Sequence, residues 1–88
     1  KGRMKLLKYI SNIENSTFVI FESPNRLIKL LNDIKNHIGN RVVSICRELT
    51  KLYDEVYLGN IGESIEHFSK KKVKGEITVV ISKAGYKL

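Results

Sequence analysis

Apolar residues recur at helical spacing in three parts of the chain: residues 4–13, the segment after Pro24, and residues 61–68. A stripe with a period near 3.6 residues is typical of a helix that buries one face. The clearest helix begins after Ser23, which can cap it, and Pro24, which needs no N–H partner in the first turn. Gly39 is a typical helix stop. The stripes consist of Met4, Leu6, Leu7, Ile10 and Ile13; Leu27, Leu30, Leu31, Ile34 and Ile38; and Ile61, Ile65 and Phe68.

Three segments are apolar on both alternating faces and rich in strand-forming residues: Thr17–Phe21, Val42–Cys46 and Ile77–Ile81. Such runs are typical of strands covered on both faces, so we predict that they are the central strands of a sheet. Glu55–Leu58 predicts a shorter strand, and the polar residues 47–53 predict a loop. The element order α-β-α-β-β-α-β therefore indicates an α/β fold, in which helices pack on a mixed sheet.

The size and composition of the chain fit one domain over residues 1–88. The hydrophobic content is 42% and the charged content 28%, as in ordinary soluble globular proteins. No apolar run approaches the roughly 20 residues of a membrane span, and no signal peptide opens the chain. The first residue, Lys1, suggests an excised segment. The sequence shows no internal repeat and no linker.

The cysteine and histidine residues suggest no metal or redox chemistry. Cys46 is the single cysteine and lies in an apolar run, which predicts a small buried side chain. A lone thiol fits a reducing compartment, so we expect a cytoplasmic protein. His37 and His67 fall in separate predicted helices without metal-ligand spacing, so no metal site is expected.

The net charge of +7 favours a polyanionic partner, but charge alone leaves nucleic-acid binding an open question. Polar clusters occur at strand ends: Glu22–Arg26, Arg47–Lys51 and Lys74–Glu76. Ligands of α/β sheets bind at the carboxyl ends of strands, so the first two clusters can line one crevice. The third, at the start of a strand, reaches the same edge only if its strand runs antiparallel to theirs.

Each cluster also has a purely structural explanation. Ser23 and Pro24 can be a helix cap, the Arg47–Lys51 group a solvated set of ion pairs, and Gly75-Glu76 a turn. Arg26 is less easily explained, because a cation in the first turn of a helix opposes the helix dipole.

Taken together, the clusters are far more specific than any one of them. Phe21-Glu22-Ser23-Pro24-Asn25-Arg26-Leu27, Arg47-Glu48-Leu49-Thr50-Lys51 and Lys74-Gly75-Glu76-Ile77 resemble, in order and spacing, the signature of the ribosomal RNA small subunit methyltransferase I family. This family is part of the tetrapyrrole methylase superfamily. The opening Lys1-Gly2-Arg3 is similar to the end of a basic loop in that family. The resemblance extends through about Ser82.

The resemblance implies a carboxyl-terminal domain, the second half of a tetrapyrrole-methylase fold. Such enzymes bind S-adenosyl-L-methionine (AdoMet) in a cleft between two α/β domains and usually form homodimers. They methylate the ribose 2′-hydroxyl of a cytidine in the decoding region of small-subunit ribosomal RNA. The amino-terminal motifs, a proline-and-glycine loop and an aspartate-glycine-threonine-proline run, are absent from this sequence. We therefore expect the isolated chain to be inactive.

By position, the resemblance implies two groups of site residues. The expected cofactor-binding residues are Glu22, Ser23, Arg47, Glu48, Leu49, Thr50, Gly75 and Glu76. The expected RNA-binding residues are Arg3, Arg26 and Lys51.

Two positions depart from the family pattern. Phe21 directly precedes Glu22 where the family has tyrosine, and Asn25 replaces the family's histidine. Because asparagine does not titrate near neutral pH, Asn25 cannot be a general base. Glu22 and Glu48 are the alternatives for that role, and no catalytic residue is assigned.

Three other interpretations remain open. The βαββαβ core order is also that of ferredoxin-like RNA-binding modules, although the chain lacks their aromatic strand signature. A tetrapyrrole-modifying methylase of the same superfamily is the second, and a structural fragment with no activity of its own is the third.

Overall fold

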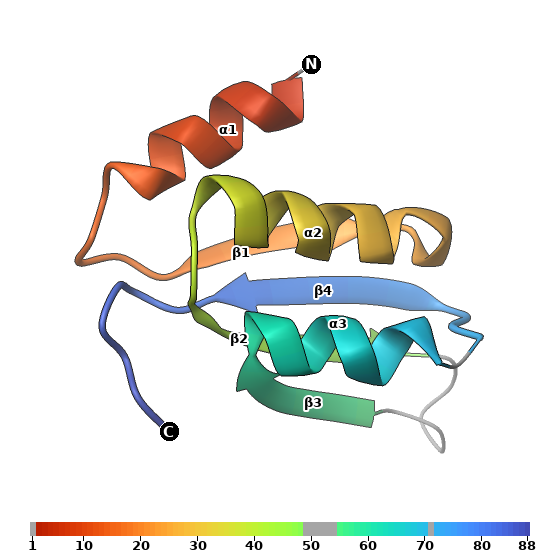
Figure 1. Cartoon of the computed structure of the whole chain (residues 1–88). Coiled ribbons are helices and arrows are strands. Elements are labelled where there is room, and N and C mark those ends of the chain that lie inside the picture. The colour runs from red at the N-terminus through yellow and green to blue at the C-terminus, as the bar shows by residue number, and fades with distance from the viewer. Residues whose placement is uncertain (1, 49–54, 71) are drawn as a thin grey trace.

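In the part of the chain that the structure describes, four strands form one sheet, and three α-helices cover one of its faces (Figure 1). The computed structural model describes residues 2–48, 55–70 and 72–88. The helices are α1 (Gly2–Ser11), α2 (Leu27–His37) and α3 (Ile61–Ser69), and a short 3₁₀ helix, η1 (Pro24–Arg26), leads into α2. The strands are β1 (Phe18–Glu22), β2 (Val42–Glu48), β3 (Glu55–Asn60) and β4 (Glu76–Ile81). The α/β class and the predicted element order are confirmed.

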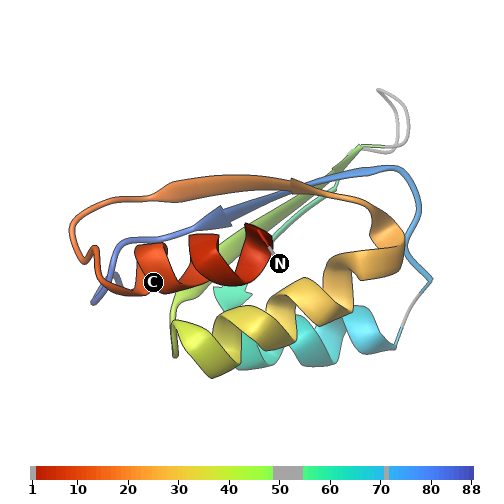
Figure 2. The same ribbon diagram turned by 90° about the horizontal axis from the view of Figure 1, so that it is seen from above.

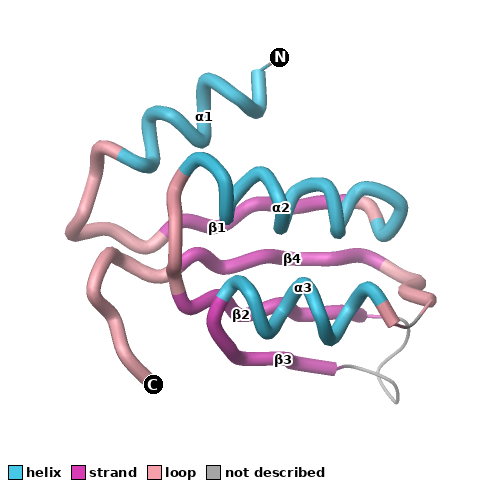
Figure 3. The backbone as a smooth tube through the Cα atoms, in the orientation of Figure 1, coloured by secondary structure: helices cyan, strands magenta, loops and turns pink. Residues whose placement is uncertain are grey.

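The last strand of the chain lies inside the sheet. The strand order is β1-β4-β2-β3, and each neighbouring pair is antiparallel (Figure 3). The sheet is therefore antiparallel throughout, which corrects the prediction of a mixed sheet. β4 therefore runs antiparallel to both β1 and β2, with Ile77 opposite Glu22 and Glu76 opposite Glu48. This is the condition under which the third polar cluster reaches the same edge as the first two.

The hydrophobic core lies between the sheet and the three helices, which share one side of it (Figure 2). The predicted stripe of α2 is buried from Leu27 through Ile34, whereas Ile38, the C-cap residue, is partly buried. Each fully buried aliphatic side chain contributes roughly 1.5–3 kcal/mol to stability. The buried apolar side chains are Leu7, Ile10, Leu27, Leu30, Leu31, Ile34, Val43, Ile45, Ile61, Phe68, Ile77, Val79 and Ile81.

No described helix covers the opposite face of the sheet, which corrects two predictions: that Thr17–Phe21, Val42–Cys46 and Ile77–Ile81 are covered on both sides, and that Thr17–Phe21 is a central strand. β1 is an edge strand, and the side chains of Val19 and Phe21 are more than half exposed, as are those of Val56 and Leu58 on β3. Apolar residues on both faces show that a strand can be covered, but not what covers it. The central positions of this open face carry no charge: Val19, Phe21, Val42, Ser44, Cys46, Val56, Leu58, Thr78 and Val80. Cys46 is only partly buried there.

The loop predicted from residue 47 begins later, because β2 extends through Glu48. Arg47 is stabilised in the strand by Glu55, its direct cross-strand partner on β3. The guanidinium donates from Nε and Nη2 to Oε1 of Glu55, at 3.0 and 2.5 Å. A polar pattern that predicts a loop can thus be a strand when its side chains find partners on the next strand.

We predict that Gly39→Ala lowers the free energy of unfolding by about 1 kcal/mol. Gly39 follows the C-cap of α2 at a φ of 104°, and an added Cβ would meet no atom within 4 Å, so the cost is purely conformational. Urea denaturation measures the change.

Gly62→Ala is the matched control, because Gly62 lies in α3 and its Cβ would make an ordinary 3.6 Å contact with Asn60 Oδ1. This variant should be neutral or more stable. Equal stability of the two variants would contradict the assigned conformation of Gly39.

Candidate cofactor and RNA site

The polar clusters meet at one edge of the sheet, where β1 and β2 end and β4 begins. Glu22 and Ser23 come from the first cluster and Glu76 from the third, and the backbone of Glu48 pairs with that of Glu76. Leu49, Thr50 and Lys51 lie outside the described residues, as does the side chain of Glu48.

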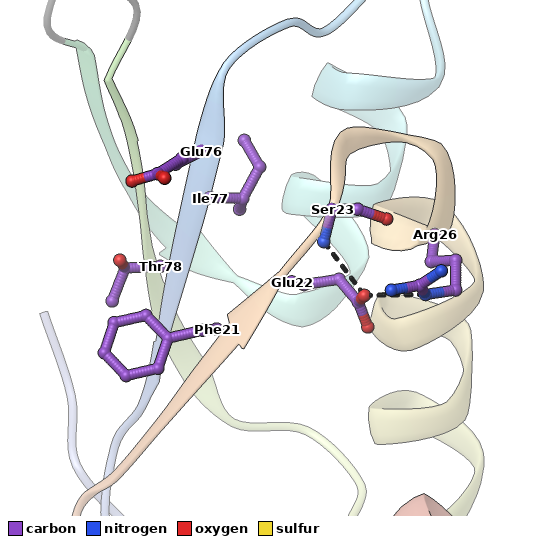
Figure 4. A pocket seen from close by; sticks show the side chains of 7 residues that line it. All are labelled: Phe21, Glu22, Ser23, Arg26, Glu76, Ile77 and Thr78. Carbon is purple, nitrogen blue, oxygen red and sulfur yellow. Dashed lines mark hydrogen bonds and ion pairs between the residues drawn. The ribbon is translucent and has the colours of Figure 1, made fainter.

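A pocket of about 550 Å³ opens at this edge (Figure 4). Its volume is within the usual range of small-molecule sites. Three of the predicted cofactor-binding residues, Glu22, Ser23 and Glu76, line it together with Arg26. The other lining residues, which no sequence pattern assigned to the site, are Phe21, Ile77 and Thr78. β1 and β4 bring them together by their pairing, which no local sequence pattern reveals.

Glu22 provides the buried charge of the site. Its side chain is 2% exposed, and one carboxylate oxygen, Oε2, accepts from the backbone N–H of Ser23 and from Nε of Arg26, both at 2.9 Å (Figure 4). The other oxygen, Oε1, forms an ion pair with Arg3 of α1. A buried carboxylate is stable only with such partners.

The position of Arg26 is explained by this ion pair. Arg26 is the N-cap residue of α2, where a positive charge opposes the helix dipole, and the first turn of α2 has no acidic residue. The carboxylate of Glu22 offsets that repulsion. The Arg26 side chain is still 64% exposed, whereas that of Arg3 is 24% exposed.

Ser23 occupies the predicted N-cap position, and Pro24 the first position of η1. The hydroxyl of Ser23, however, makes no capping hydrogen bond, and it is buried without a partner among the described residues. The expected side-chain cap is therefore wrong. Figure 4 shows this buried hydroxyl turned toward Arg26 and away from Phe21 and Thr78, so it does not face a ligand at those residues.

Arg47 and Gly75 do not line the pocket. Arg47 belongs to the helix-covered side of the sheet, where Glu55 binds it and its side chain is 17% exposed. Gly75 has a φ of 88°, which favours glycine over other residues and makes it the turn before β4. In the described part of the chain, no cluster of His, Cys, Asp and Glu could hold a metal ion, and no helix is suited to span a membrane.

No family model matches the chain. Curated proteins named ribosomal RNA small subunit methyltransferase I are similar to it, and three of them illustrate the similarity. The Thermotoga maritima protein is 52% identical over 93% of the chain, and that of Halalkalibacterium halodurans 40% identical over 83%. The Hydrogenobaculum protein is 36% identical over 94% of the chain. The chain belongs to the ribosomal RNA small subunit methyltransferase I family. It spans only 36%, 25% and 36% of these relatives' lengths.

Membership in the ribosomal RNA small subunit methyltransferase I family confirms the resemblance that the three clusters carry. The clusters that define it are those that the sheet brings to one edge. Asn25, the departure from the family's histidine, is exposed and does not line the pocket.

We predict that Ser23→Ala changes the free energy of unfolding by less than about 0.5 kcal/mol, because no capping hydrogen bond is lost. Asn60→Ala is the comparison. Asn60 caps α3 by accepting from the N–H of Glu63 at 2.8 Å, as part of a capping box, and its loss should cost about 1 kcal/mol. Chemical denaturation of both variants checks the difference. A larger loss for Ser23→Ala would mean that its hydroxyl has a structural partner.

Proposed function

We propose that this chain forms the carboxyl-terminal domain of an AdoMet-dependent methyltransferase that methylates a cytidine ribose 2′-hydroxyl in small-subunit ribosomal RNA. The observation that carries the proposal is the pocket, where Ser23 and Glu76 of two family motifs lie beside Arg26. The names of the relatives support a ribosomal RNA methyltransferase and favour it over a tetrapyrrole-modifying enzyme.

The residues of the pocket fit an adenosyl cofactor. The Phe21 ring is 79% exposed and offers a surface on which adenine can stack. The exposed carboxylate of Glu76 is a partner for the hydroxyl and ammonium groups of such a ligand. AdoMet, when bound, supplies a methyl group on a positively charged sulfur.

The residues of this chain would contribute by positioning. Methyl transfer requires the ribose oxygen in line with the methyl group and the sulfur, and correct placement supplies much of the rate gain. Arg26 lines the same pocket as Ser23 and Glu76, so an RNA backbone bound by Arg26 would lie next to the cofactor. Arg3 and Lys51 are proposed as further phosphate contacts.

The remaining assignments are proposals from the family resemblance. The segment Arg47–Thr50 would form a wall of the cleft through backbone groups, and Gly75 would let the cofactor approach the start of β4. No catalytic base is assigned, because Asn25 cannot titrate and the carboxylate of Glu22 is already ion-paired with two arginines and accepts from a backbone N–H. Other parts of the full-length enzyme would provide the second wall, and full-length members are proposed to form homodimers.

We predict that the 88-residue chain alone transfers no methyl group to small ribosomal subunits. A fusion of the preceding region of the Thermotoga maritima relative to this chain should restore transfer, because it completes the cleft. Labelled AdoMet measures incorporation, and mass spectrometry of the digested RNA identifies 2′-O-methylcytidine. Activity of the isolated chain, or methylation of a base alone, would refute the proposal. Strong RNA binding by a fusion that takes up no AdoMet would favour the RNA-binding module instead.

In the same fusion, Phe21→Ala should weaken AdoMet binding roughly three- to tenfold through loss of aromatic stacking, while RNA binding changes little. Val19→Ala is the matched control, because Val19 lies on the same open face of β1 but does not line the pocket. Calorimetric titration gives both affinities. Equal effects of the two substitutions would argue against a cofactor at this edge.

A further inference from the structure

The carboxylate of Glu22 joins three segments of the fold. It lies at the end of β1, its oxygen Oε1 pairs with Arg3 of α1, and its oxygen Oε2 accepts from Nε of Arg26, at the start of α2. The backbone N–H of Ser23 adds a third bond. The two guanidinium groups and one carboxylate together leave a net charge of +1 at the entrance to α2.

Resting on the proposed function, we infer that Glu22 is the positioning residue of a phosphate-binding site formed by Arg3 and Arg26. In this proposal Glu22 is no longer assigned to the side chains that contact the cofactor. The ligand of the site is a phosphate of the RNA backbone, for which the planar guanidinium fork is well suited.

The geometry of Arg26 supports this role. Glu22 engages Nε of Arg26, so both terminal nitrogens remain free for a ligand, and no described residue accepts a hydrogen bond from them. The side chain is 64% exposed although Glu22 holds its Nε. A free arginine loses much rotamer freedom on binding, whereas a side chain already held by a buried carboxylate loses less. Glu22 therefore lowers the entropic cost of phosphate binding.

A positioning role for Glu22 and simple charge attraction predict opposite effects of Glu22→Gln on RNA binding. Glu22→Gln removes one negative charge, so the net charge rises from +7 by one unit and binding of a polyanion should become stronger. If Glu22 positions the arginines, binding should become weaker despite the added positive charge. The sign of the change separates the two explanations.

The test measures binding of a fluorescent single-stranded RNA of the decoding-region sequence to the 88-residue chain at several salt concentrations. For Glu22→Gln the dissociation constant should rise roughly fivefold or more, and Glu22→Asp should recover part of the loss. Glu66→Gln is the matched control, since Glu66 is an exposed carboxylate paired with Lys70 at 3.8 Å. It should bind as well as the unmodified chain or better. Arg26→Gln should reduce the log–log salt slope by about 0.7 to 0.9.

Arg26→Lys keeps the net charge but lacks the Nε donor that Glu22 holds, so it should also weaken binding. This variant keeps the test decisive if Glu22→Gln does not fold, as judged by circular dichroism. Unchanged or tighter RNA binding by Glu22→Gln, or by Arg26→Lys in that case, would overturn the inference while the proposed function stands. A loss of stability with unchanged affinity would do so as well, because it would leave Glu22 a structural role only. If the unmodified chain binds no RNA at low salt, the proposed RNA contact fails together with the inference.

Discussion

The antiparallel placement of β4 between β1 and β2 is the constraint on which the site depends. The three polar clusters are far apart in the sequence, and the third stands at the beginning of a strand rather than at its end. Because β4 runs against both neighbours, its first residue lies opposite the last residue of β2, and Ile77 lies opposite Glu22. With a parallel β4, Glu76 would lie at the other end of the sheet and the pocket would have no floor.

The charges at this edge are arranged around one buried carboxylate. Glu22 compensates Arg26, whose position at the start of α2 would otherwise be unfavourable, and ties α1 to the sheet through Arg3. Ser23, the next residue, has a buried hydroxyl without a partner among the described residues. The Glu22 side chain thus stabilises the local fold, while the Arg26 side chain that it holds remains 64% exposed.

Local patterns predicted the elements but not their neighbours. The stripe from Leu27 to Ile34 and the stop at Gly39 depend on short-range spacing and backbone conformation, and both are confirmed. The edge position of β1 depends on pairing with a strand from the other end of the chain, so no local pattern indicated that Phe21 would be exposed. Arg47 was expected in a loop because its partner, Glu55, belongs to a different strand. The role of Glu22 was missed for the same reason, since Arg3 reaches it only after α1 folds back onto the sheet.

A crystal structure of the Thermotoga fusion with bound S-adenosylhomocysteine would locate the cofactor. We expect the adenosyl group at the edge where β1 and β2 end, in contact with the Phe21 ring and within hydrogen-bond distance of the Glu76 carboxylate. The Glu22 carboxylate should still bind Arg3 and Arg26. Density for the ligand on the helix-covered side of the sheet, or next to Arg47 but away from Phe21, would show that the proposed site is wrong.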